Sequence, residues 1–323
     1  MTPATGAHTV KPRLGISTCL LGENVRYDGG HAHDRFLTDT FGPHVEWVPV
    51  CPEVECGLPV PREPMHLEGD PDDPRLVTIR TRVDLTARMN KWAAKRVSEL
   101  ERESLVGFVF KSRSPSSGMV RVKVYDENGV ARKVGVGLFA RAFMDRFPLL
   151  PAEDSGRLND PHIRENFIER VFCLMRYRDA SSGRRTRGSL VRFHSTHKLQ
   201  IMAHSPKILR EMGRLVARAK ELEIADLFAS YEEMLLRALR LKATPGKNAN
   251  VIQHAMGYFK KDLSRAEKHE MIEVLEQYRG GLLPLIVPVT LLSHYVRKYE
   301  PDYLLEQSYL DPHPVELKLR NHA

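Results

Sequence analysis

Two thiols and two carboxylates stand together in one short stretch of this chain. Residues 48–58 read VPVCPEVECGL, so an apolar run ends at Cys51 and two acids, Cys56 and a glycine follow at once. An apolar run that stops at proline and glycine predicts a buried strand leading into a tight loop. Because sites in open α/β sheets form just outside the carboxyl ends of strands, the stretch predicts a functional site. On this segment alone, the alternative is a half-buried cysteine pair with solvated acids.

Two further predicted strands end in residues that could do chemistry. Residues 14–22 (LGISTCLLG) read as a buried strand with Cys19 at its end, and residues 106–111 (VGFVFK) run into the loop SRSPSSGM at 112–119. A loop rich in serine, glycine and proline offers hydroxyls and backbone N–H groups to a ligand. We expect the three strand ends to converge on one side of a parallel or mixed sheet.

The elements that must position these groups form an α/β unit with helices on both faces of the sheet, predicted for residues 13–150. Residues 1–12 are expected to be a disordered lead, and residues 149–161, rich in Pro, Asp and Gly, are the predicted connector. From residue 160 to 323 the apolar periodicity is almost purely helical, which predicts an all-α bundle. Within the first unit, the spacing predicts helices at 31–41, 84–103 and 137–147, strands at 46–50 and 76–80, a hairpin at 120–134 and a loop at 59–74.

The charge of the chain is unevenly distributed. The whole sequence carries 49 Lys and Arg against 41 Asp and Glu, a net charge of +8. Residues 161–323 hold 27 basic and 19 acidic residues, so the excess of +8 lies there, and residues 1–160 hold 22 of each. A basic half favours binding of a polyanion, although a merely basic surface is the alternative. The basic residues that could meet phosphates are Arg184, Arg185, Arg187, Lys242, Lys247, Lys260 and Lys261.

The composition also limits the class of protein. Four cysteines in 323 residues do not predict a disulfide framework, and because residues 1–11 have no apolar h-region we expect no secretory signal. The longest apolar run, residues 281–292, is too short to cross a bilayer and carries two prolines. We therefore expect a cytoplasmic protein with reduced thiols, without a membrane span and without an obligate protein partner.

The spacing of the thiols leaves several chemistries open. Cys51 and Cys56 are five apart and Cys19 is distant, which is weak evidence for a zinc site. Three thiolates from separate strand ends better suit an iron–sulfur cluster, in which one iron would keep an open position as a Lewis acid. A Cys–His nucleophilic enzyme is a competitor, although no histidine adjoins these cysteines in sequence.

Several motifs carry a resemblance to known families. In the first half they are ISTCLLG (16–22), VRYDGG (25–30), VPVCPE (48–53), GLPVPR (57–62) and KSRSPSSG (111–118), and in the second half HSP (204–206), NVIQHAMGYF (250–259) and DPHP (311–314). On these motifs, residues 13 to about 147 resemble the thiouracil desulfidase family, and the second half resembles the uncharacterised YbgA-like helical domain. Fused proteins of this kind are similar to tRNA 4-thiouridine desulfidases.

The resemblance implies a [4Fe–4S] cluster held by three cysteines. In that family the unligated iron takes the sulfur of a thiolated pyrimidine, water replaces it at carbon, and hydrosulfide leaves. Cys19 and Cys51 match the first two ligands, but the third family cysteine falls at Ser117. Cys56 is predicted to replace that ligand; oxygen ligation by Ser117 and loss of the cluster are the alternatives.

Roles for the remaining residues follow from hydrolysis of a C=S bond. Glu53 is the predicted acid and base, or else the partner of Arg62 in an ion pair. Ser114 is predicted to orient water or substrate, or else to stabilise its turn. The residues predicted to bind substrate, or to hold the loops around it, are Arg26, Asp28, Arg62, Lys111 and Ser117.

The sequence therefore predicts an iron–sulfur-dependent desulfidase of thiolated uracil. The expected substrate is 4-thiouridine in tRNA, bound with the help of the helical half and converted to uridine and hydrosulfide. The alternatives are a non-catalytic tRNA-binding or redox-sensing protein with a degenerate cluster site, and a structural zinc protein.

Overall fold

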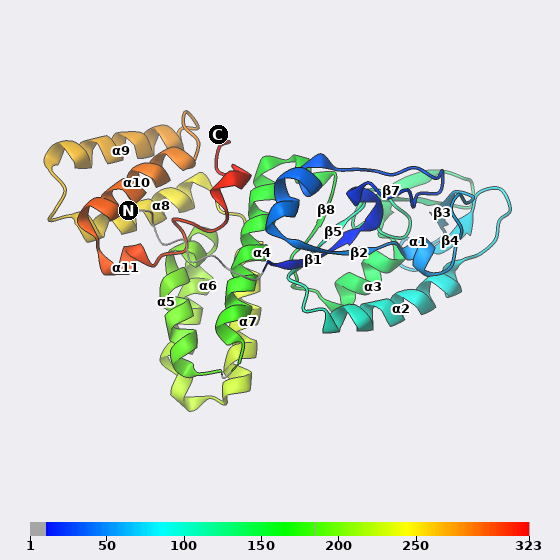
Figure 1. Cartoon of the computed structure of the whole chain (residues 1–323), viewed down its shortest axis with the longest axis horizontal. Coiled ribbons are helices and arrows are strands. Elements are labelled where there is room, and N and C mark those ends of the chain that lie inside the picture. Colours follow the sequence, from blue (N-terminus) through cyan, green and yellow to red (C-terminus); the bar gives the residue numbers. More distant parts are fainter. Residues whose placement is uncertain (1–10, 184, 323) are drawn as a thin grey trace. The chain divides into compact units, whose positions relative to one another are not determined.

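The computed structural model describes residues 11–183 and 185–322, and the chain divides into two compact units, Met1–Asp160 and Pro161–Ala323 (Figure 1). The predicted lead of residues 1–12 lies outside the described residues except for its last two. Arg184, one of the basic residues predicted to meet phosphates, also lies outside them.

A four-stranded parallel sheet forms the centre of the first unit. Its order is β2 (Glu46–Val50), β1 (Arg13–Ser17), β5 (Gly107–Phe110) and β8 (Ala152–Asp154). The three strands predicted to converge are adjacent in this order, so their carboxyl ends meet at one edge. The fourth strand, β8, lies in the segment predicted as a connector, which therefore contributes to the sheet.

Helices cover both faces of this sheet. On one face, α2 (Thr86–Arg102) and α3 (Leu138–Arg146) enclose a core with Val48, Val50 and the phenylalanines of β5. On the other face, Phe41 of the helical turn Phe36–Phe41 packs edge-on against Trp47, with ring centroids 5.6 Å apart. Trp47 alternates with Val48 along β2, which places the two side chains on opposite faces.

A second, mixed sheet packs against the other part of α2. Its order is β4 (Arg75–Thr78), β3 (Met65–Glu68), β6 (Val122–Tyr125) and β7 (Ala131–Gly135). The inward side chains of these strands form a core with Met89 of α2 and Leu138 of α3. The hairpin predicted at 120–134 is confirmed by β6 and β7. The loop predicted at 59–74 was wrong in part, because its proline- and aspartate-rich composition conceals the four-residue strand β3.

The second unit is all helical, as the periodicity predicted. One cluster of buried apolar residues in this unit extends from Leu199 to Tyr309. Cys173 is fully buried. Among the described residues, no helix combines the length and apolar character needed to cross a membrane. The helices are α4 (Pro161–Ser181), α5 (Arg187–His204), α6 (Pro206–Ala217), α7 (Ile224–Arg240), α8 (Pro245–Met256), α9 (Arg265–Arg279), α10 (Ile286–Tyr299) and α11 (Asp302–Leu305).

Candidate active site

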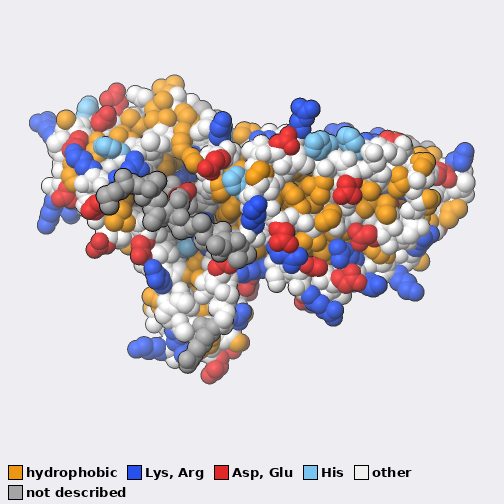
Figure 2. All heavy atoms as spheres, in the orientation of Figure 1, with side chains coloured by type: hydrophobic (Ala, Val, Ile, Leu, Met, Phe, Trp, Pro, Cys, Tyr) orange, Lys and Arg blue, Asp and Glu red, His pale blue; other side chains and the backbone are white. Residues whose placement is uncertain are grey.

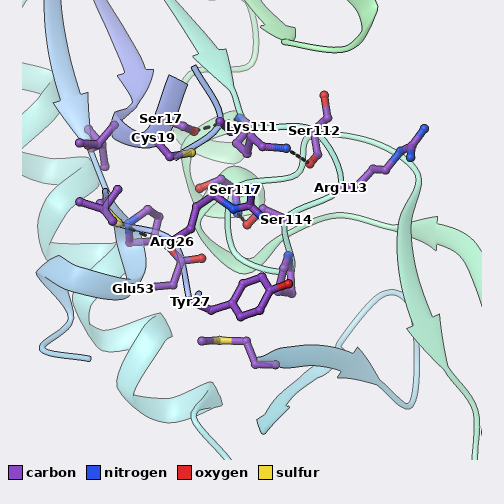
Figure 3. Close-up of a pocket in the computed structure, with 18 of the residues that line it drawn as sticks. Ser17, Cys19, Arg26, Tyr27, Glu53, Lys111, Ser112, Arg113, Ser114 and Ser117 are labelled. Atoms are coloured by element: carbon purple, nitrogen blue, oxygen red, sulfur yellow. Dashed lines mark hydrogen bonds between the residues drawn. The ribbon is translucent and has the colours of Figure 1, made fainter. Parts of the chain in front are cut away.

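A pocket of about 440 Å³, which we call the thiol pocket, opens at the carboxyl edge of the parallel sheet (Figure 3). Its walls are the loops that follow β1, β2 and β5. β1 and β2 are hydrogen-bonded neighbours, so the turns that follow them bring Cys19 and Cys51 to the same edge. The residues that line the pocket include Ser17, Thr18, Cys19, Arg26, Tyr27, Cys51, Glu53, Arg62, Lys111, Ser112, Arg113, Ser114 and Ser117.

Local backbone structure fixes both thiols. Cys19 lies in the 3-10 turn Thr18–Leu21, and its carbonyl accepts a hydrogen bond from Ala32 N at 2.9 Å. Cys51 is the N-cap of the single-turn helix α1 (Pro52–Glu55), and its N–H donates to Glu55 Oε1 at 2.8 Å. Both residues are buried, so each thiol has a restricted orientation at the pocket wall.

Burial disfavours the thiolate form of both cysteines. Burial raises the pKa of Cys19, an effect that the positive charges of Lys111 and Arg26 oppose. Burial and the negative charge of Glu53 raise the pKa of Cys51 to about 12. A metal bound here must therefore displace protons from sulfur.

Glu53 is held by a chain of serine hydroxyls. Ser116 Oγ donates to Glu53 Oε1, and Cys51 Sγ donates to Oε2 at 3.6 Å. Because Ser116 has a single hydroxyl proton, Ser114 must donate in the contact between the two serines at 2.9 Å. The predicted ion pair also forms, with Arg62 Nη2 at 3.9 Å from Oε2. The carboxylate therefore has a fixed orientation at the pocket wall.

Ser114 organises the loop that carries these hydroxyls. Its Oγ accepts hydrogen bonds from the N–H groups of Ser116 at 3.3 Å and Ser117 at 3.1 Å. A Cβ at Gly118 would lie 2.4 Å from Val122 and 2.6 Å from the Ser114 carbonyl, so the tight loop requires glycine there. The turn-stabilising role considered for Ser114 is thus present in the structure.

Ser117 occupies the pocket in the position where the resemblance places a cysteine. The residue is 3% exposed, and it lines the pocket with Cys19 and Cys51. Within the described part of the chain, its hydroxyl makes no hydrogen bond, although its N–H is bonded to Ser114. The oxygen is therefore available to a ligand in the pocket.

Cys56 is not among the residues that line this pocket. Its Sγ donates to Glu53 O at 3.3 Å, and its side chain packs against the apolar cluster of the second sheet. Five residues along a helical turn rotate a side chain by about 140°, which turns Cys56 away from Cys51. Among the described residues, no three His, Cys, Asp or Glu side chains converge to hold a metal ion. The structure thus does not gather the predicted set of Cys19, Cys51 and Cys56.

Arg62 ties two pocket loops together. Its Nη1 donates to Val25 O at 3.0 Å, and its N–H donates to Tyr27 O at 2.8 Å. Its side chain also lines the pocket beside Glu53. Arg62 therefore combines the predicted loop-holding role with a position facing any ligand in the pocket.

The other predicted binding residues divide between the pocket and its supporting loop. Arg26 lines the pocket while its Nη1 donates to His31 O at 3.1 Å, and Lys111 lines it while its Nζ donates to Ser112 O at 3.0 Å. Asp28 is not among the lining residues. Its carboxylate pairs with Arg26 at 3.1 Å and accepts from Gly30 N at 3.0 Å, so it shapes the loop.

Three lining or supporting residues were missed in the sequence. Ser116 was one of several serines in the loop, and nothing in its sequence neighbourhood marks it as the one that contacts Glu53. Tyr27 is 43% exposed at the pocket margin, with the Arg26 guanidinium 5.6 Å from its ring centre (Figure 3). Its position between two charged residues in a turn-rich loop was the available signal. Arg113 lines the pocket with no comparable signal in sequence.

Family models match two parts of the chain. Residues 14–155 match the model described as 2-thiouracil desulfurase, and residues 198–314 match the model described as a protein of unknown function (DUF1722). Both resemblances predicted from the sequence motifs are thereby confirmed.

Individual relatives match each half. The uncharacterized protein YbgA of Escherichia coli (strain K12) is 28% identical over 165 residues, which covers 51% of this chain and 98% of YbgA. Among solved structures, the [4Fe-4S]-dependent thiouracil desulfidase TudS (DUF523Vcz) is 28% identical, with a TM-score of 0.38. That match covers 46% of this chain and 95% of the TudS chain.

Proposed function

Because residues 14–155 match the family model described as 2-thiouracil desulfurase, we propose that this chain removes sulfur from a thiolated uracil ring in the thiol pocket. The observation that carries this proposal is the meeting of Cys19, Cys51, Glu53 and Ser117, from three separate strand ends, around one pocket. A volume of about 440 Å³ lies in the range of small-molecule sites.

The donors of the pocket fit an iron–sulfur cluster. Cys19 and Cys51 offer two thiols, the ligands that such clusters prefer, and Ser117 offers a hydroxyl without a hydrogen bond to the rest of the described chain. We assign these three residues as the cluster ligands, with Ser117 in place of Cys56. A [4Fe–4S] cluster held by these residues would supply a Lewis acid that polarises the C=S bond of the substrate.

Glu53 acts as the proton acceptor of the reaction. Water adds its oxygen to the ring carbon as the C=S bond is replaced by C=O, and hydrosulfide leaves with one of the two water protons. The Glu53 carboxylate accepts the other proton and passes it to solvent. Ser116 holds this carboxylate toward the pocket through its hydrogen bond to Oε1, so that the base is oriented before substrate arrives.

The exposed ring of Tyr27 and the cations around the pocket suit a pyrimidine. A flat ring at the margin offers a stacking surface for a base. Arg26 and Lys111 supply positive charge beside the place where hydrosulfide would leave as an anion. These contacts orient the substrate and favour the charged product.

We further propose that the thiolated base is 4-thiouridine within tRNA. The excess of +8 in residues 161–323 supports this choice, because a basic surface attracts the phosphates of RNA. The replacement of a cysteine ligand by Ser117 favours one other function, a non-catalytic tRNA-binding or redox-sensing protein.

The deciding experiment is anaerobic reconstitution of the full chain with iron and sulfide. Iron content is measured first, followed by sulfide release from thiolated tRNA, 4-thiouridine and free thiouracil. We expect iron and sulfide release from the unaltered chain and neither from Cys19→Ala. Binding of thiolated tRNA without sulfide release would favour the non-catalytic function, and protein that takes up no iron would overturn the cluster assignment.

A further inference from the structure

A second pocket of about 440 Å³ lies on the outer face of the mixed sheet. It shares Met65, Arg113 and Pro115 with the thiol pocket, so the two pockets have a wall in common. The remaining lining residues are His66, Ile79, Arg121, Val122, Lys123, Tyr125 and Lys133. A molecule in one pocket would therefore reach the other across Arg113.

Four exposed cations surround this second pocket. Lys123 of β6 lies directly opposite Lys133 of β7 in the antiparallel register. Like charges directly opposite each other destabilise a sheet unless an anion lies between them. Among the described residues, neither lysine forms an ion pair, and Arg113 and Arg121 form none.

Two of the nearby acids, Glu68 and Asp126, already have partners. Glu68 is held by Arg82 at 2.7 Å and by Arg75 at 3.1 Å. The Asp126 carboxylate accepts hydrogen bonds from the N–H groups of Asn128 at 3.0 Å and Val130 at 2.9 Å, and Glu127 stands in the same turn. On the face drawn in Figure 2, acidic and basic side chains are interspersed over the α/β unit. Four unpaired cations around one pocket are a local departure from that pattern, and they attract anions.

The floor of this pocket carries a flat aromatic pair. His66 stacks on Tyr125 with ring centroids 4.6 Å apart and an interplanar angle of 27°. Aromatic faces interleaved with cations are typical of surfaces that bind single-stranded nucleic acid, where bases stack and phosphates meet positive charge. An acidic peptide would contact the cations but has no base to stack on the aromatic faces.

We propose that Arg113, Arg121, Lys123 and Lys133 form a phosphate groove that holds the backbone of an RNA strand whose thiolated base enters the thiol pocket. In a nucleotide, one ribose joins the base to its phosphates, so a pocket for the base requires a phosphate site close by. Arg113, which lines both pockets, meets this requirement. The inference rests on the proposed function of the thiol pocket and adds the residues that hold the phosphates of its substrate.

The groove predicts a measurable loss of RNA affinity when its lysines are neutralised. Each phosphate contact contributes about 0.7 to 0.9 to the slope of log K against log salt. Removal of two contacts should lower the magnitude of this slope by about 1.5. At 0.1 M salt, one decade below 1 M, the lower slope corresponds to RNA binding that is about 30-fold weaker than that of the unaltered chain.

The test is fluorescence anisotropy of a labelled, sulfur-free, uridine-rich single-stranded RNA with the full chain, titrated at several salt concentrations. The variant Lys123→Gln/Lys133→Gln is compared with Lys91→Gln/Lys95→Gln. The second variant is the control, because it also removes two positive charges, but from the exposed side of α2. This helix packs, through Met89, on the face of the mixed sheet opposite to the groove. We expect the groove variant to lose about 30-fold in affinity and the control variant to stay within about twofold of the unaltered chain.

Three outcomes would overturn the groove or its assignment to RNA. Equal losses in both variants would mean that RNA senses only net charge, and an unchanged affinity in the groove variant would mean that the strand binds elsewhere. If polyglutamate displaces RNA at equal charge concentration from the unaltered chain, the groove is a general polyanion site and the assignment to RNA fails. Sulfide release from free thiouracil, measured on the unaltered chain alone, tests the proposed function separately, because free thiouracil carries no phosphate.

Discussion

Substitution of Ser116 by alanine should slow desulfidation without weakening the binding of substrate. Ser116 is fully buried, and its hydroxyl donates to Glu53 Oε1. A hydrogen bond to a charged group contributes about 1.5 to 3 kcal/mol, and burial leaves no water to replace the lost donor. At about 1.36 kcal/mol for each tenfold change in rate, Ser116→Ala should lower kcat by about ten- to hundredfold. Because Ser116 acts through Glu53 as a positioning residue, KM and iron content should change little.

The loss of kcat in Ser116→Ala is compared with the loss in a variant of Glu53 itself. Glu53→Gln removes the proton acceptor and should lower kcat by about 10²- to 10⁴-fold. If the serine acts only by orienting that carboxylate, Ser116→Ala should cost nothing further when Glu53 is already glutamine. The matched control is Ser98→Ala, which removes a hydroxyl that only bonds the Ala94 carbonyl on the exposed side of α2.

The assay is the rate of sulfide release from free thiouracil by anaerobically reconstituted protein, with iron per chain measured on the same samples. The four members of the double-mutant cycle are the unaltered chain, the two single variants and the double variant. An equal factor for Ser116→Ala in both backgrounds would refute the reasoning. So would a loss of iron in Ser116→Ala that matches the loss of rate, because the serine would then support the cluster site as a whole.

Three further predictions test the ligands, the core and the helical unit. Ser117→Cys should raise the amount of iron retained after reconstitution, and Ser117→Ala should lower it. Cys56→Ser should leave the iron content unchanged. Loss of iron in Cys56→Ser would instead show that Cys56 is a ligand. Gly15→Ala places a Cβ 2.1 Å from Phe108 Cδ2, so overpacking should cost about 1 to 3 kcal/mol in the free energy of unfolding, and an unshifted urea midpoint would contradict this. Burial lowers the pKa of His197 to about 3, below its ordinary value of about 6.5. Between these two pH values the unfolded chain binds a proton at His197 and the folded chain does not. Stability from this group is complete above about pH 6.5 and should fall by about 2 kcal/mol by pH 5; an equal melting temperature of α-helical signal at pH 7.5 and pH 5 would count against it.

The strands that position the site could be predicted because their composition is unambiguous. Apolar runs that stop at Cys19, at Cys51 and at the serine loop have few alternatives to buried parallel strands, and their ends do meet at one edge. The two missed strands, β3 and β8, have four and three residues and lie among prolines, aspartates and glycines. Their pairing depends on neighbours distant in sequence, so local composition indicated loop.

For the third ligand, proximity in sequence favoured Cys56, whereas the lining of the pocket favours Ser117. Cys56 was favoured because it is close to Cys51 in the chain, but the helical turn between them directs the two side chains differently. Ser117 is 66 residues from Cys51 and lines the same pocket, because the loop after β5 and the turn after β2 lie at one sheet edge. The contact between Ser116 and Glu53 has the same origin. Such pairings follow from strand order, which no local motif encodes.

Net charge is a coarser guide, because it averages over faces that the fold separates. Residues 1–160 carry equal numbers of acids and bases, which indicated that polyanion binding belonged to the helical half. Within these residues, strand pairing places Lys123 directly opposite Lys133 on one face of the sheet. The acid Glu68 forms ion pairs with Arg75 and Arg82 and so does not neutralise the two lysines. If phosphates bind there, the base and its backbone are recognised by one rigid unit with Arg113 between them. Substrate selection would then depend on the spacing of two pockets, which a count of charges cannot report.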